Sequence, residues 1–297
     1  MKSHNTAALR QTALAWLAEG RPSLLVQVAS VRGSTPRETD ARMLVSMSEV
    51  QGTVGGGHLE WQAIAQARQA LSEQAAGSHN GKPMASWTQS FALGPTLGQC
   101  CGGVMALGFS PLCAQTLADW PSPKPRFHLE LHGAGHVGQA IVRLLADIDC
   151  TVRWIDQRLD DDTVLAGQQL ENIGLPDGAH LALLPAHIRC LATNDAAAEV
   201  VDAPDGCFHL IMTHRHDLDL LIADAVLRRN DVREGRAWVG LIGSGTKRAA
   251  FERRLMARGH AANTVARMAC PIGLPGIKGK EPAVIAIAVV GQLLQLP

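Results

Sequence analysis

The chain has 297 residues, of which 46% are hydrophobic and 18% are charged. This length suits one large domain or two of ordinary size, and the composition excludes a largely disordered chain. The 27 basic residues balance the 27 acidic ones. No basic surface is therefore predicted, and neither nucleic acid nor a membrane is an expected partner.

The cysteine content and the N-terminal sequence indicate the compartment. The chain has seven cysteines and no C-x-x-C motif, which fits a reducing compartment better than a disulfide framework. The first residues have no apolar run with a cleavage site, and no stretch is long enough for a membrane span. These features predict a cytoplasmic protein.

Residues 1–120 are predicted to form a smaller N-terminal α/β domain. Apolar residues at helical spacing indicate a first helix around residues 9–17, and strands are expected at 24–31 and 42–46. A glycine-rich turn at 52–60 then leads into a helix that ends near Leu71.

This turn contains the consecutive glycines Gly55, Gly56 and Gly57. Their backbone N–H groups could bind an oxyanion, and arginines of the preceding segment could add charge-assisted hydrogen bonds. The candidate arginines are Arg32, Arg37 and Arg42. The alternative is a turn in which glycine only supplies positive φ angles.

Two adjacent cysteines, Cys100 and Cys101, directly precede Gly102 and Gly103. A disulfide between neighbours is disfavoured, because their Cα atoms lie about 3.8 Å apart, below the usual minimum of about 4.4 Å. A thiol beside two glycines would lie among open backbone donors, which stabilise a thiolate. The alternative is a pair of buried, inert cysteines.

Residues 121–126 include three prolines and predict a semi-rigid linker between two domains. Residues 127–297 then have the pattern of a Rossmann-type, doubly wound parallel sheet. An apolar strand at 127–131 leads into Gly133, Gly135 and Gly138, which match G-x-G-x-x-G. An amphipathic helix and a strand at 151–155 follow, ending in Asp156.

Each glycine of this motif has its own role: a tight turn, approach of a pyrophosphate, and close packing of helix on strand. Asp156 lies about twenty residues further on, where a ribose-binding acid is expected. His132 and His136 flank the turn, and such lone histidines are expected behind the ligand contacts or facing solvent. A dinucleotide site is predicted, with a Rossmann unit that binds no dinucleotide as the alternative.

Two later loops follow predicted strands and should line the same crevice. The first contains His214 and His216, which lack a third ligand at fixed spacing and therefore favour hydrogen bonding to a ligand over metal binding. The second contains Ser244 and Lys247 at the start of a helix, a second anion cradle. Thr246 interrupts the Walker A pattern there.

Together these segments resemble the XdhC/CoxI family, the accessory proteins of xanthine dehydrogenase and related molybdenum hydroxylases. The matching stretches are VRGSTPRETDARMLV, GTVGGGHLE, LGPTLGQCCGG, HGAGHVG with WIDQR, THRHDLD, GLIGSGTKRAAFERRL and PIGLPGIKGKEPAVIAIAV. They extend from about residue 24 to the C-terminus, and the paired cysteines resemble the XdhC branch. Gly245 stands where the family commonly has arginine, which weakens an anion site on that loop.

The resemblance implies a chaperone, rather than an enzyme with catalytic residues, that binds molybdenum cofactor (molybdopterin). It would hold the cofactor while a cysteine desulfurase installs the sulfido ligand, and would then deliver it to apo xanthine dehydrogenase or a related hydroxylase. Cys101 is the first candidate for contact with molybdenum and Cys100 the second. The implied cofactor-binding residues are Cys100, Cys101, Gly55, Gly56, Gly57, Gly102, Gly103, Gly133, Gly135, His136, Gly138, Asp156, His214, His216, Ser244 and Lys247.

The alternative function is an NAD(P)-dependent oxidoreductase that uses the glycine turn and Asp156. It lacks an identifiable acid–base set in the N-terminal domain. Whether a nucleotide binds at the Rossmann site stays open, as does the oligomeric state, a homodimer included.

Overall fold

The computed structural model describes residues 6–77, 84–93, 102–120, 124–159 and 184–297. The chain divides into two compact units, Met1–Pro123 and Lys124–Pro297, which are described separately here. Residues 121–123 of the predicted linker lie outside the described residues, as do Cys100 and Cys101.

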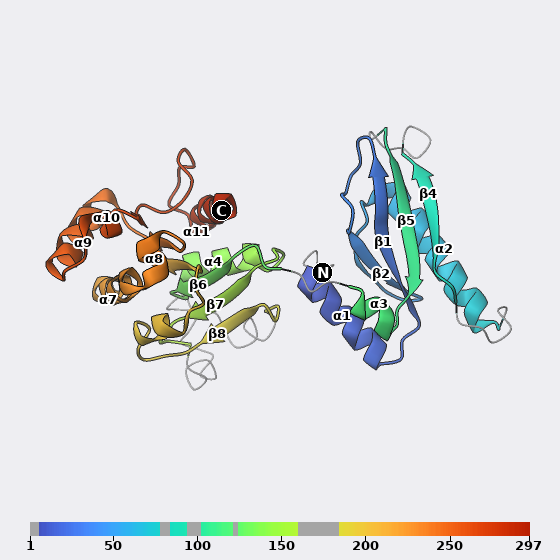
Figure 1. Ribbon diagram of the computed structural model, residues 1–297, viewed down its shortest axis with the longest axis horizontal. Helices are drawn as coiled ribbons and strands as arrows, with labels where there is room; N and C mark the ends of the chain where they lie inside the picture. Colours follow the sequence, from blue (N-terminus) through green and yellow to red (C-terminus); the bar gives the residue numbers. More distant parts are fainter. Residues whose placement is uncertain (1–5, 78–83, 94–101, 121–123, 160–183) are drawn as a thin grey trace. The chain divides into compact units, whose positions relative to one another are not determined.

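The N-terminal unit is a five-stranded antiparallel sheet with helices on both faces (Figure 1). Its strands lie in the order β3-β2-β1-β5-β4. They are β1 (Ser23–Arg32), β2 (Arg42–Ser46), β3 (Val50–Gly52), β4 (Trp87–Ala92) and β5 (Val104–Pro111). The helices are α1 (Thr6–Ala18), α2 (Gly57–Ala75) and α3 (Ala114–Ala118).

The side chains of the central strand β1 alternate between the two faces of the sheet, so this strand contributes to both apolar cores of the unit. Leu24 and Val26 face α2 and join one apolar cluster, whereas Leu25 joins a second cluster formed with α1 and α3. A strand directs successive side chains to opposite faces, so a strand buried on both faces is apolar at nearly every position. The sequence of β1, SLLVQV at its start, has that property.

The C-terminal unit is a six-stranded parallel sheet in the order β11-β10-β9-β6-β7-β8 (Figure 1). The strands are β6 (His128–His132), β7 (Thr151–Ile155), β8 (Ile188–Leu191), β9 (Phe208–Ile211), β10 (Trp238–Leu241) and β11 (Met268–Ala269). The helical elements are α4 (His136–Leu145), η3 (Ala198–Asp202), α7 (His216–Arg228), α8 (Asn230–Glu234), α9 (Gly245–Ala257), α10 (Ala262–Val265) and α11 (Pro282–Gln295).

The helices of this unit cover both faces of the sheet. Helices α4 and α11 form one apolar layer with β6, and α7, α9 and α10 form the other. Counting from β6, the strand order is 3-2-1-4-5-6 read from the β8 edge, which is the doubly wound Rossmann order. Successive strands are added toward one edge from β6 to β8 and toward the other edge from β9 to β11. The ligand crevice of this fold therefore lies at the carboxyl ends of β6 and β9, where the strand order reverses.

Candidate functional site

The glycine turn after β6 is built as the motif requires. Gly133 has a φ of +124°, and a Cβ atom there would lie 2.4 Å from the carbonyl oxygen of Met212. A Cβ atom on Gly138 would lie 2.3 Å from the carbonyl oxygen of Gly133. Gly135 begins α4 and faces open space. The turn therefore has two glycines fixed by packing and one that leaves room for a ligand.

The carboxylate of Asp156 is bound within the protein. It lies after β7 and is 5% exposed. Oδ2 accepts hydrogen bonds from the Ala134 N–H at 2.8 Å and from Nη2 of Arg158 at 2.8 Å. Oδ1 accepts the backbone N–H and Nε of Arg158, both at 2.9 Å. Because a carboxylate offers about four acceptor positions, a ribose hydroxyl would have to displace one of these donors.

Because of these hydrogen bonds, the C-terminal unit should lose stability at acid pH. Burial by itself would raise the pKa of the Asp156 carboxyl, but the hydrogen bonds from Arg158 and Ala134 lower it below its usual value. A carboxyl whose pKa is lower in the folded state stabilises the fold fully above the unfolded pKa of about 3.9, and this contribution is lost as the pH falls through the folded pKa.

We therefore expect Asp156→Asn to lower the free energy of unfolding at pH 7 and to have a progressively smaller effect as the pH falls below about 4. Urea unfolding of both proteins between neutral and acidic pH measures this difference. A difference that stays constant over the whole range would contradict the assignment.

The loops after β9 and β10 are joined by a buried ion pair. The carboxylate of Asp219 is fully buried and accepts a hydrogen bond from Nζ of Lys247 at 2.7 Å. It also accepts the N–H of Thr213 at 2.9 Å and its hydroxyl at 2.7 Å. Lys247 donates a further bond to the carbonyl oxygen of Ile242 at 2.8 Å. The lysine predicted to bind an anion thus holds the crevice loops together.

Other predicted residues of these loops have separate positions. Ser244 caps α9 by accepting the N–H of Lys247 at 3.3 Å, while His216 begins α7 and is exposed. His214 is also exposed, and partial burial followed by the charge of Arg158 lowers its pKa. The carbonyl oxygen of Met212, two residues before His214, lies against Gly133. The loop that contains His214 therefore begins beside the glycine turn.

The two histidines that flank the glycine turn differ. His136 is exposed, as expected for a lone histidine at a helix start. His132 is fully buried, and both its ring nitrogens lack a hydrogen-bond partner among the described residues. Burial, followed by the charge of Arg153, lowers the pKa of His132 to about 3. It is therefore neutral at physiological pH, and of the two expected positions, behind the ligand contacts or facing solvent, its burial excludes the second.

The glycine turn of the N-terminal unit also contains an internal carboxylate. The side chain of Glu60 is 9% exposed. It accepts the N–H groups of Val54 and Gly56, each at 3.2 Å, and a short bond from the hydroxyl of Thr53. Of the predicted oxyanion cradle, the N–H of Gly56 is thus bound by Glu60, and the N–H of Gly55 donates to the hydroxyl of Thr53 at 3.2 Å.

The loop at residues 32–37 contacts both glycine-rich segments of this unit. A Cβ atom on Gly103 would lie 2.5 Å from the carbonyl oxygens of Arg32 and Ser34. A Cβ atom on Gly55 would lie 2.8 Å from Cγ of Pro36. Gly103 lets two backbone segments approach closely, and Gly55 does the same for a proline ring. The glycine turn and the Gly102–Gly103 segment therefore both contact the 32–37 loop.

Gly102 faces open space and directly follows Cys101. Cys100 and Cys101 lie outside the described residues, so their predicted roles remain predictions. Within the parts of the chain that the structure describes, no group of three potential metal ligands is present. Among those same residues, no helix has the length and apolar character needed to cross a bilayer.

Sequence reasoning missed the internal partners of these turns, namely Arg158, Asp219 and the carboxylate role of Glu60. Glu60 and Asp219 each lie four to seven residues after the donors that they bind within their own loop. Asp156 instead lies at the end of the strand next to the one that leads into its donor, Ala134. An acid at that spacing from a glycine or threonine turn is the signal that could have identified them. The sequence gives no comparable signal for the bond between Lys247 and Asp219, which are 28 residues apart.

Comparison with known proteins matches two families to separate parts of the chain. The XdhC Rossmann domain family matches residues 129–293, and the XdhC and CoxI family matches residues 16–79. An Escherichia coli protein named uncharacterized protein YqeB is 29% identical over 280 residues, covering 93% of this chain and 43% of that protein. The chain thus spans less than half the length of this relative.

A crystal structure of a protein from Bacillus halodurans, described as a xanthine dehydrogenase, has the same fold. It superposes with a TM-score of 0.67 at 19% identity, covering 98% of this chain and 95% of that one. The Rossmann-domain match extends over more than half of the 297 residues, and the N-terminal unit contains the second match. The chain therefore belongs to the XdhC family.

Proposed function

We propose that this protein is a maturation chaperone for a molybdenum hydroxylase of the xanthine dehydrogenase type. It binds molybdenum cofactor, protects it while a cysteine desulfurase exchanges its terminal ligand for sulfur, and delivers it to the apo-enzyme. Membership of the XdhC family supports an accessory role. The binding and delivery steps are the part that we propose.

One structural observation supports the proposal most strongly. The 32–37 loop contacts Gly103 and Gly55 through backbone approaches that only glycine permits. Gly103 lies two positions after Cys101 in the sequence. These contacts support our proposal that the glycine turn, the arginine-containing loop and the segment around Gly103 belong to one site.

The chemistry of this site suits the cofactor better than a small metabolite. Molybdenum cofactor combines a phosphate, a flat polar pterin and soft sulfur atoms around the metal. A thiolate such as Cys101 or Cys100 suits a soft metal environment. An open glycine such as Gly102 lets a ligand approach the backbone, and arginine suits a phosphate.

The alternative of an NAD(P)-dependent oxidoreductase has one observation in its favour. The strand order of the C-terminal unit and the open Gly135 at the start of α4 are those of a dinucleotide-binding fold. The four hydrogen bonds to Asp156 argue against it, because they occupy the acceptor that a ribose would use. Desalting the protein after anaerobic incubation with molybdopterin or with NADH shows which ligand is retained.

The decisive experiment is to produce the client hydroxylase in cells with and without this protein while the cofactor supply is limiting. Without the protein, the enzyme should fold and keep its other redox centres but contain little sulfurated cofactor. Full activity of the enzyme made alone would refute the proposal and favour the oxidoreductase alternative.

Two cysteine variants serve as matched controls in the same cells. Cys101→Ser exchanges one atom and should leave the fold nearly intact while reducing cofactor retention and client activity, and Cys100→Ser should have the smaller effect. Equal retention by the wild-type protein and both variants would remove the thiols from the mechanism.

A further inference from the structure

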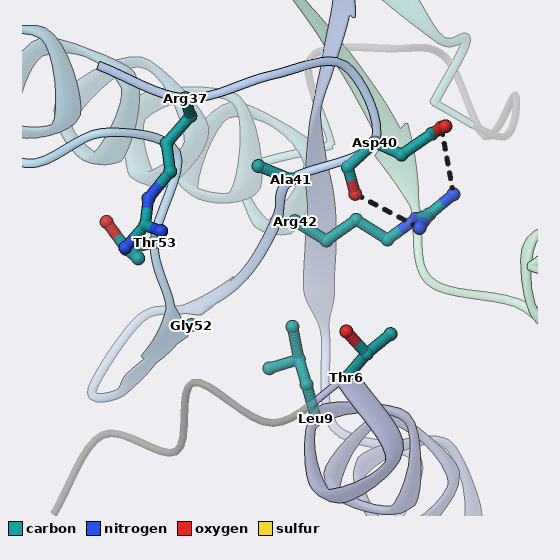
Figure 2. A pocket seen from close by; sticks show the side chains of 8 residues that line it. All are labelled: Thr6, Leu9, Arg37, Asp40, Ala41, Arg42, Gly52 and Thr53. Atoms are coloured by element: carbon teal, nitrogen blue, oxygen red, sulfur yellow. Dashed lines mark hydrogen bonds and ion pairs between the residues drawn. The ribbon is translucent and has the colours of Figure 1, made fainter. Parts of the chain in front are cut away.

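The N-terminal unit has a cavity of about 180 Å³ that is lined in part by Arg37 and Arg42 (Figure 2). The first turn of α1 forms one wall, the segment from Arg37 to Arg42 forms a second, and Gly52 with Thr53 forms a third. Gly52 closes this wall tightly, because a Cβ atom there would lie 2.5 Å from the carbonyl oxygen of Arg42.

A buried and poorly neutralised cation lies in the wall. The side chain of Arg42 is 9% exposed, and its Nε has no hydrogen-bond partner among the described residues. Its guanidinium lies 5.3 Å from the ring centroid of Trp120. Its ion-pair partner is Asp40, at 3.4 Å, whose side chain is 70% exposed. A carboxylate so exposed to water neutralises a buried charge weakly.

A second cation faces the same space. Arg37 is exposed and forms no ion pair among the described residues, and it lines the cavity together with Thr53. Figure 2 shows the guanidinium of Arg42 directed toward Asp40 and away from Arg37.

We propose that this cavity binds the oxyanion of a phosphate-bearing ligand. Arg37 makes the direct contact, and Arg42 adds positive potential from its place in the wall. Glu60 occupies the N–H groups of Val54 and Gly56, so the glycine turn is closed to a second anion while the Arg37 side stays open.

The size of the cavity restricts the ligand that it takes. Sites for whole cofactors have volumes of about 300–1,000 Å³, well above the 180 Å³ found here. The cavity therefore suits a phosphate monoester group with the few atoms attached to it. The inference rests on the proposed function in one respect only, that this phosphate belongs to the pterin cofactor.

The test is titration of the full chain with inorganic phosphate, followed by calorimetry, for the wild type, Arg37→Gln and Arg143→Gln. Arg143 is exposed on α4, so its replacement removes the same charge elsewhere. We expect Arg37→Gln to weaken phosphate binding about tenfold, as loss of a charged hydrogen bond does, and Arg143→Gln to leave it unchanged. No binding by the wild type, or equal binding by all three proteins, would overturn the proposal.

Competition separates this inference from the proposed function. If phosphate displaces retained cofactor from the wild type but not from Arg37→Gln, the phosphate of the cofactor is the natural occupant. If phosphate binds at Arg37 without displacing cofactor, the cavity takes a free phosphate or another ester, and its link to the cofactor is refuted. Cofactor retained by a wild type that binds no phosphate refutes the cavity and leaves the chaperone function standing.

Discussion

Replacing Lys247 by methionine should lower the free energy of unfolding by about 3–5 kcal/mol. The side chain of Lys247 is 11% exposed and that of its partner Asp219 is fully buried. Methionine keeps the length and apolar stem of the lysine but leaves the carboxylate without its counter-ion. An uncompensated buried charge is among the most destabilising changes in a folded protein.

Two matched variants test this explanation. Arg228→Met removes a cation from Asp224 on the solvent face of α7, where the arginine side chain is 59% exposed. That pair should contribute no more than about 0.5 kcal/mol. The double variant Lys247→Met with Asp219→Asn should regain much of the lost stability, because no charge is then buried. Urea unfolding measures all three, and an effect of Lys247→Met as small as that of Arg228→Met would contradict the prediction.

Gly133→Ala should destabilise the C-terminal unit by about 3 kcal/mol or more, because it combines backbone strain with overpacking. The residue has a φ of +124°, and the new methyl group would lie 2.4 Å from the carbonyl oxygen of Met212. This oxygen belongs to the backbone directly after β9, so it cannot move aside as a flexible side chain can. The loop after β9 would be displaced, and with it His214.

Gly135→Ala is the control on the same turn. Gly135 has a φ of −69°, and a Cβ atom there would have no heavy atom within 4 Å. Its effect on stability should stay within about 0.5 kcal/mol, although the added methyl group narrows the approach of a ligand to α4. Urea unfolding separates the two glycines, and equal losses for both variants would show that the turn does not have this geometry.

Local sequence patterns correctly predicted the Rossmann unit. Strand β7 has the predicted bounds, and β6 is displaced by one residue. Each of these elements is encoded within a short window, by an apolar run, a helical stripe or a glycine with one permitted φ. The sequence therefore determined the fold class and the position of the glycine turn.

Strands β4 and β5 were not predicted, for a physical reason. The outward residues Thr88, Gln89 and Ser90 of β4 are polar and exposed, so this edge strand has little of the apolar alternation that indicates a strand. Its existence depends on pairing with β5, which pairs in turn with β1 about eighty residues earlier. Pairing between distant segments has no local signal.

The predicted site depended on tertiary structure in the same way. By itself the sequence identified the glycine turns, Asp156 and Lys247 as groups suited to an anion or a ribose. Only the tertiary structure shows that the carboxylates of Glu60, Asp156 and Asp219 accept hydrogen bonds from donors of those turns. A buried donor must be satisfied by some acceptor, and whether that acceptor is a ligand or a carboxylate of the chain is decided by which side chains the fold brings within hydrogen-bonding distance.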